Sequence, residues 1–467
     1  MENSESESRS PFAVQKMADY FSAVSYDDLP KSVIRHAKTL ILDTIGTALG
    51  AASGDWGGQI VGAGGTMAGS GRSTILATGK RTGMVAAALT NGTLAHALDF
   101  DDTYFAAVIH PSCCVVPAAL AAAEECGASG RELIAGAVAG YEVLLRVSHA
   151  GLNNFFKDDF HTTGLLGPLG AAAAAARTLR FAPGPMASAL GIAAGLGGGI
   201  LQTMIEGNNV KSLQAGYAAH GGVLATLLAS AGVSGPREIF EGRLGLYQTY
   251  LGEDRHDISA LTDGLGELWR TDRIAIKMYP GAHRHHFFVE SARNLVAAHG
   301  LNPTDIAEIR CHTSAQHHFY NFTPAGYRPP NSHAARFSVP FLIAAALRNG
   351  QVGPDTFSEA AIRDTELLGL AERVTYEVRD GAEAPEGRGH VRIFMKDGTS
   401  HENIQSYIRG LPEYPASEED IWLKFRDNAR GVLAEVSIRD LYRRIMELEY
   451  LDDIGDLFAP LRQRRES

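Results

Sequence analysis

The chain has 467 residues, 45% of them hydrophobic and 20% charged, a composition that predicts a folded protein of two or three domains. Its formal net charge of −11 argues against nucleic acid as a partner, because proteins that bind nucleic acid carry a basic face. The four cysteines have no framework spacing, so we expect reduced thiols in a cytoplasmic protein. The polar start and the interrupted apolar runs predict neither a signal peptide nor a membrane span.

Apolar residues with helical spacing fill the chain up to about residue 269. Short breaks rich in glycine, serine or proline separate them, which is typical of antiparallel helical hairpins. We predict helices at residues 12–24, 33–48, 84–98, 115–125, 131–150, 164–179, 185–205 and 213–231.

From residue 270 onward, alternating apolar and polar residues predict strands, and Asp397-Gly398 predicts a hairpin turn. Helical spacing returns near the C-terminal end. The sequence thus predicts a mainly α protein, in which a large all-helical domain, residues 1–269 and 409–467, receives an inserted smaller α+β lid domain, residues 270–408. In this second half we expect strands at 273–278, 306–313, 376–379, 390–396 and 400–407, and helices at 287–299, 336–349, 359–373, 418–433 and 438–461.

One stretch, from His96 to Ser112, concentrates polar groups between apolar helices. Buried charge is costly unless it is paired, so two interpretations have equal weight at this point. The side chains cap helix ends, or they form a proton-transfer site. The groups concerned are Asp99, Asp101, Asp102, Thr103 and His110.

Two further patches lie at the starts of predicted helices. His161 precedes two threonines where a helix dipole favours an anion, although an ordinary threonine cap explains the same residues. Lys211 is the only Lys or Arg between Arg180 and Arg237. Since a buried lysine needs a counter-charge, either an internal carboxylate or a ligand carboxylate supplies it.

The second half adds several cationic side chains. Lys277 lies on the first predicted strand, where it either faces solvent or enters a site. His283, His285 and His286 lack the spacing of metal ligands, so they predict the cationic edge of a pocket rather than a metal site. Arg336 either grips a carboxylate or lies on the surface, and the surface is the simpler interpretation.

Nucleotide cofactors are not predicted, because the chain has neither a Gly-x-Gly-x-x-Gly nor a Walker A pattern. The cysteine positions do not suit an iron–sulfur cluster either. What remains is carboxylates, imidazoles and isolated cations, which suit acid–base chemistry on a small polycarboxylate. Cations would hold its carboxylates while a base removes a proton α to one of them.

Five ordered segments resemble the MmgE/PrpD family: A-H-A-L-D-F-D-D-T with H-P-S, F-H-T-T-G-L-L-G, N-N-V-K-S-L-Q-A-G and I-K-M-Y-P. The similarity spans about residues 11–460. That family includes 2-methylcitrate dehydratase, cis-aconitate decarboxylase and iminodisuccinate epimerase. The resemblance implies the two-domain arrangement above, a homodimer, and no metal or organic cofactor.

The resemblance also implies the roles of individual residues. His110 and Asp99 would transfer protons, Lys211 and Lys277 would hold carboxylates and stabilise negative charge, and His161 would position the substrate. The predicted catalytic residues are therefore Asp99, His110, His161, Lys211 and Lys277, and the predicted substrate-binding residues are Thr103, His286 and Arg336.

The chain departs from the family at three places. The spacing from Thr103 to His110 is about one residue longer than in the decarboxylases, Gly281 replaces a frequent cysteine, and Phe341 replaces a tyrosine. The missing hydroxyl disfavours decarboxylation of cis-aconitate. The sequence thus predicts a cofactor-independent hydro-lyase similar to 2-methylcitrate dehydratase, with decarboxylation or epimerisation as alternatives. A carboxylate-binding protein without catalysis is the alternative outside the enzymes.

Overall fold

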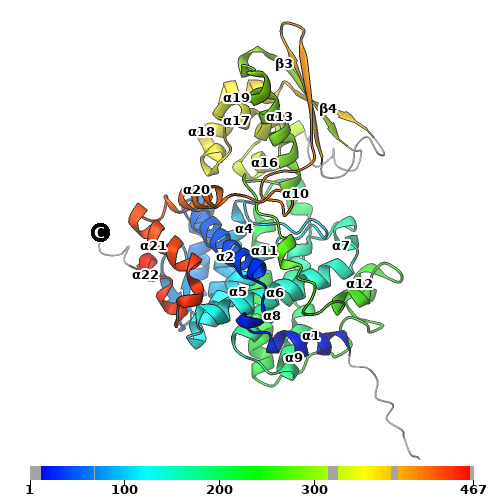
Figure 1. The fold of residues 1–467 in the computed structure, drawn as a ribbon, viewed down its shortest axis with the longest axis vertical. Helices are drawn as coiled ribbons and strands as arrows, with labels where there is room; N and C mark the ends of the chain where they lie inside the picture. The colour runs from blue at the N-terminus through cyan, green and yellow to red at the C-terminus, as the bar shows by residue number, and fades with distance from the viewer. Residues whose placement is uncertain (1–11, 68, 314–323, 380–387, 463–467) are drawn as a thin grey trace, which may run out of the picture.

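The computed structural model describes residues 12–67, 69–313, 324–379 and 388–462. These residues are mainly helical, as predicted, and contain two small sheets. Two large groups of buried apolar side chains form the interior. One joins the first 276 residues to the C-terminal helices, and the other lies within residues 279–393. Figure 1 shows the second group's elements stacked above the larger helical part.

The large part is a packed set of helices around α8, whose alanine run Ala171–Ala176 is completely buried. Small side chains let neighbouring helices approach closely. Gly216 on α11 illustrates this, because a Cβ atom there would lie 1.9 Å from Oγ1 of Thr93 on α4. The helices of this part are α1 (Ala13–Ala23), α2 (Lys31–Ala52), α3 (Asp55–Thr66), α4 (Met84–Ala97), α5 (Ser112–Cys126), α6 (Gly130–Ala150), α7 (Asn154–Lys157), α8 (Thr162–Thr178), α9 (Pro183–Ala194), α10 (Gln202–Glu206), α11 (Val210–Ser230) and α12 (Leu246–Leu251).

Helix α6 is the one described helix that is long and apolar enough to cross a membrane by length and composition. Within the protein, 94% of its most apolar stretch is buried. It packs against α5 and α8. Its apolar character is therefore explained by its place in the core.

The C-terminal helices return to the beginning of the chain. Helices α20 (Glu418–Ala429) and α21 (Glu435–Met446) pack against α2, and α22 (Ala459–Arg462) follows them. In Figure 1 the red and orange helices lie beside the blue α2. Nζ of the buried Lys424 lies 2.5 Å from Oδ1 of Asp43 on α2 and donates to the backbone oxygen of Phe100 at 2.8 Å. The end of the chain thereby supports the loop that follows α4.

The smaller part contains a four-stranded sheet in the order β4-β3-β5-β6. Strands β3 and β4 are parallel, and the other neighbours are antiparallel. Helices α13 and α17 pack against each other, and α13 covers β5 and β6. The elements are α13 (His286–His299), β3 (Ile306–Thr313), α15 (Pro324–Tyr327), α16 (Ser332–Arg336), α17 (Val339–Asn349), α18 (Glu359–Ile362), α19 (Thr365–Ala371), β4 (Val374–Val378), β5 (Gly389–Met395) and β6 (Ser400–Gln405).

The predicted strand at 273–278 is wrong. Ala275 bonds Thr103 on one side, while Ile276 donates to Gly410 on the other, so no continuous ladder forms. Three predicted helices also break: 185–205 at a glycine run, 359–373 at Asp364, which caps α19, and 438–461 after Met446. The structure adds a hairpin that the sequence did not predict, β1 (Ser73–Ile75) with β2 (Lys80–Thr82).

Candidate active site

A cavity of about 400 Å³ lies where the two parts meet. Its polar lining comes from the loop after α4, from the segment between α7 and α8, from the start of α11 and from residues 283–285 of the smaller part. The remainder of its wall is largely aromatic and aliphatic, including Phe105, Phe160, Met204 and Phe337. Five of the predicted site residues line this one cavity: Asp99, Thr103, His110, His161 and Lys211.

The carboxylate of Asp99 pairs with both of the predicted lysines. It follows the C-terminal end of α4 with a left-handed backbone, φ 47°. One carboxylate oxygen lies 3.2 Å from Nζ of Lys211, and the other accepts a hydrogen bond from Lys277. Burial raises the pKa of Asp99, but the two ammonium groups outweigh it and hold the pKa well below its ordinary value. Asp99 is therefore an ionised carboxylate.

Lys211 lies in the first turn of α11 and is 6% exposed. Asp99 is the internal counter-charge that the sequence left open. Because the same ammonium also borders the cavity, it is placed to contact a ligand without losing its partner.

His110 and His161 present similar imidazoles to the cavity. Nδ1 of His110 lies 2.7 Å from the backbone oxygen of Asp102, and Nδ1 of His161 lies 2.6 Å from Oε1 of Gln214. Each Nδ1 therefore carries the proton, which leaves Nε2 with a lone pair. Burial, reinforced by Lys211, lowers the pKa of both rings well below the ordinary value. Both are neutral, and Nε2 of His161 has no hydrogen-bond partner among the described residues.

Thr103 links the loop after α4 by hydrogen bonds to the segment that connects the two parts. Its backbone exchanges two hydrogen bonds of 2.8 Å with Ala275. Its hydroxyl lies 3.3 Å from Nδ1 of His110 and borders the cavity. The hydroxyl is thus fixed between the imidazole and any bound ligand.

The other three predicted residues lie behind the cavity wall. Lys277 is completely buried and donates to the carboxylate and the backbone oxygen of Asp99. His286 packs against Tyr279 and His283. Arg336 donates to the backbone oxygen of Ala97 at 3.2 Å, and burial lowers its pKa to about 10. The surface interpretation of Arg336 is wrong, since the residue is 8% exposed.

The capping interpretation holds for one carboxylate of the central stretch. Asp102 accepts hydrogen bonds from the backbone and hydroxyl of Ser112, the first residue of α5. Burial and the nearby Asp101 raise the pKa of Asp102 to about 8. Sequence reasoning named Asp101 in the central stretch but gave it no role in the predicted site, and it did not select His96 from the same stretch. It assigned His283 no role beyond a pocket edge. His283 borders the cavity.

Two of the sequence departures have structural explanations. Gly281 has φ 119°, and a Cβ atom there would lie 2.4 Å from the backbone oxygen of Arg336, so this backbone needs glycine. Phe341 is completely buried against Phe357 and does not border the cavity.

Known proteins with similar sequences were found along nearly the whole chain. Cis-aconitate decarboxylase from Aspergillus terreus is 30% identical over 96% of this chain and 95% of its own. The human cis-aconitate decarboxylase is 28% identical over 80% of this chain and 79% of its own. A cis-aconitate decarboxylase-like protein of Aspergillus oryzae is 25% identical over 95% and 96%.

The family comparison covers both parts of the fold. Residues 15–259 match the MmgE/PrpD N-terminal domain, and residues 279–448 match the MmgE/PrpD C-terminal domain. The relatives named above are lyases, so an enzyme of the lyase kind is supported. The chain belongs to the MmgE/PrpD family.

Proposed function

We propose that this protein is a lyase that acts on a small di- or tricarboxylate without a metal or an organic cofactor. The observation that carries the proposal is the meeting of Lys211, His110 and His161 in the lining of one cavity. A cation and two neutral imidazoles are the groups needed to bind a carboxylate and to move a proton beside it.

The chemistry divides among the described groups. The ammonium of Lys211 binds a substrate carboxylate and stabilises the enolate-like charge that develops α to it. His110 and His161 exchange protons through Nε2, and the hydroxyl of Thr103 orients the substrate. Lys277 acts through Asp99, which it keeps ionised. This role replaces the direct contact with substrate that the family resemblance implied for Lys277.

Decarboxylation of a cis-aconitate-like substrate is our first candidate reaction. The named relatives support it along nearly the full chain. The apolar wall of the cavity supports it too, because an apolar surrounding disfavours the charged carboxylate relative to the neutral CO₂ that leaves. The carbon–carbon electron pair then remains on the substrate, and a proton from the site is added to carbon.

Dehydration of a 2-methylcitrate-like substrate is the second candidate. It is the hydro-lyase reaction that the family resemblance first indicated, and the acid, base and cation that it needs line the same cavity. Here one site group removes the proton α to a carboxylate, and another protonates the hydroxyl that leaves as water.

We also propose two architectural features implied by the family. Residues 270–408 would act as a lid over the cavity, because His283 reaches it from that part. The chain would form a homodimer through α11, where the exposed residues Val210, Leu213 and Tyr217 make an apolar row.

Product analysis by NMR tests the two candidate reactions. The enzyme is incubated separately with cis-aconitate, 2-methylcitrate and iminodisuccinate. Loss of one carboxylate from cis-aconitate supports the first candidate, and a new double bond from 2-methylcitrate supports the second. EDTA should leave the rate unchanged. Calorimetric binding across the panel without turnover would contradict the enzyme and favour a binding protein.

A further inference from the structure

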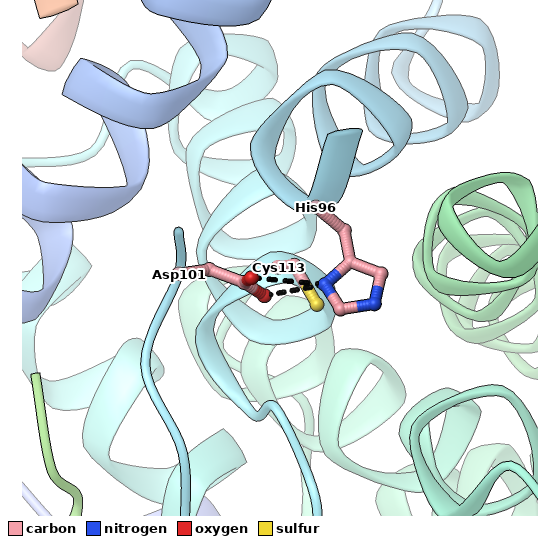
Figure 2. A group of neighbouring side chains, drawn as sticks. All are labelled: His96, Asp101 and Cys113. Carbon is pink, nitrogen blue, oxygen red and sulfur yellow. Dashed lines mark hydrogen bonds and ion pairs between the residues drawn. The ribbon is translucent and has the colours of Figure 1, made fainter. Parts of the chain in front are cut away.

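Behind Lys211 lies a chain of buried groups that the roles above do not use. Both carboxylate oxygens of Asp101 lie within 2.9 Å of Nδ1 of His96, and Nε2 of His96 lies 2.6 Å from Nζ of Lys211. Figure 2 shows Asp101 facing the ring of His96, with Cys113 beside them. Asp101 and His96 are at most 1% exposed.

With Lys211 as an ammonium, one arrangement of protons satisfies these contacts. Burial raises the pKa of Asp101, but the rings of His96 and His110, the hydrogen bond from His96 and the ammonium of Lys277 outweigh it and leave the pKa below its ordinary value, so Asp101 is an acceptor. Nδ1 of His96 then donates to Asp101. Its Nε2 has a lone pair and accepts from the ammonium of Lys211.

We propose that Asp101 and His96 form a proton relay for Lys211, and that Lys211, rather than His110 or His161, exchanges the proton at the substrate carbon. The inference rests on the proposed function. In the first step one proton moves from Nζ of Lys211 to Nε2 of His96. This leaves a neutral amine and an imidazolium beside the Asp101 carboxylate, with no change in total charge.

In the second step the amine takes the proton from the carbon α to a substrate carboxylate. The electron pair of the C–H bond becomes the enolate, and Lys211 is again an ammonium. The reverse order of steps delivers a proton to carbon. A carboxylate that holds and stabilises an imidazolium is an arrangement that enzymes use for proton transfer, and here the outer group is a lysine.

The same cluster is poorly suited to a metal ion, although His96, Asp101 and Cys113 are potential ligands. The ammonium of Lys211 touches the ring nitrogen that would remain for a metal, and a cation there would be repelled. The hydrogen bonds to Asp101 already use Nδ1. The relay therefore accounts for this cluster better than a metal site.

Burial and the ammonium of Lys211 lower the pKa of His96, so the ring is neutral at rest, whereas Asp101 and Asp99 oppose this shift and stabilise the imidazolium. Asp99 pairs with Lys211, and Lys277 pairs with Asp99. The rings of His110, His161 and His333, whose pKa values are lowered by burial, and the guanidinium of Arg336 also lie nearby. On the other side, Asp101 interacts with Asp43, Asp102, Cys113 and Lys424.

The variants Asp101→Asn and His96→Gln test the relay with any substrate that the wild type turns over. Asp101→Asn removes the charge that stabilises the imidazolium, so we expect kcat at pH 7 to fall at least 100-fold with KM changed less than threefold. His96→Gln keeps an acceptor for Lys211 but cannot take a proton, and it should lose kcat equally.

Cys113→Ser is the matched control, because Cys113 lies in the same buried cluster but outside the hydrogen-bonded chain. It should retain wild-type kcat and pH profile. Wild-type kcat in His96→Gln would show that the imidazole only positions Lys211, and this would overturn the relay. Wild-type kcat in Asp101→Asn would overturn it as well.

A readout without substrate separates this inference from the proposed function. The ¹⁵N NMR spectrum of histidine-labelled enzyme should show His96 protonated on Nδ1, with the signal assigned by its absence in His96→Gln. Asp101→Asn should shift this tautomer. If the tautomer is found but no substrate is turned over, the proposed function fails while the arrangement stands; protonation on Nε2 instead contradicts the relay.

Discussion

Asp99 shows how single residues determine the character of this site. One carboxylate in a left-handed backbone position pairs with ammonium groups from α11 and from the connection before α13. Taking three charges out of water is costly, and the mutual pairing offsets that cost. The result is a negative group that stays ionised, beside imidazoles that stay neutral.

Lys211→Met should lower kcat by about 10³-fold and leave the fold intact, since removing a preorganised charge at a reacting centre costs about this much. Asp99 keeps Lys277 as a partner, so the buried carboxylate is not left alone. Steady-state kinetics and thermal melting measure the two effects. Lys38→Met is the matched control, because Lys38 is equally buried and pairs with Glu449 at 2.8 Å. It should lower the melting temperature only, and an active Lys211→Met enzyme would remove Lys211 from the mechanism.

Asp102 should make stability depend on pH. Its pKa is raised to about 8 in the folded protein from 3.8, so the folded state binds the proton more tightly. The stability it contributes is complete below about pH 4 and is lost as the pH rises through 8. Asp102→Asn should therefore flatten the fall of the melting temperature between pH 5 and 8. An unchanged pH dependence would contradict a protonated Asp102.

At the scale of elements, the approach of α11 to α4 places Lys211 against His96. That approach depends on small residues, above all on Gly216, which faces Thr93. Larger side chains would separate the helices and carry the ammonium away from its partners.

Gly216→Ala should cost about 1–3 kcal/mol of stability through overpacking and should also reduce kcat. Gly58→Ala on α3 is the control, because a Cβ atom there meets nothing within 4 Å. It should be neutral or slightly stabilising. Equal melting temperatures for both variants would show that the two helices tolerate a wider separation.

At the scale of the whole molecule, the C-terminal helices, the helical part and the sheet-containing part converge around the loop after α4. Lys424 supports that loop from α20, and Ala275 bonds it through Thr103. The cavity therefore depends on three distant segments of the chain.

The proposed homodimer predicts a mass near twice 49.9 kDa in light scattering after gel filtration. Tyr217→Lys places a charge in the apolar row on α11 and should shift the protein toward the monomer. Tyr407→Lys, an exposed tyrosine on the smaller part, is the matched control. A monomeric wild type would refute the dimer.

Much of the architecture follows from the sequence alone. Helical periodicity located α1, α2, α4, α5, α6, α8 and α11, and alternation located β3, β5 and β6, because these patterns record which face of an element is buried. The central polar stretch and the two lysines also stand out in sequence, since charge among apolar residues is rare.

Only the tertiary structure decided which groups meet. Lys277 was expected on a strand and lies instead in an irregular connection behind Asp99, because the two residues before it bond to two different segments. Arg336 was expected on the surface, but it donates a hydrogen bond to the C-terminal end of α4. His96, which faces Asp101, contacts Lys211 on a helix more than a hundred residues away in the sequence. Local patterns report burial along the chain, whereas hydrogen bonds between distant segments depend on how the helices pack.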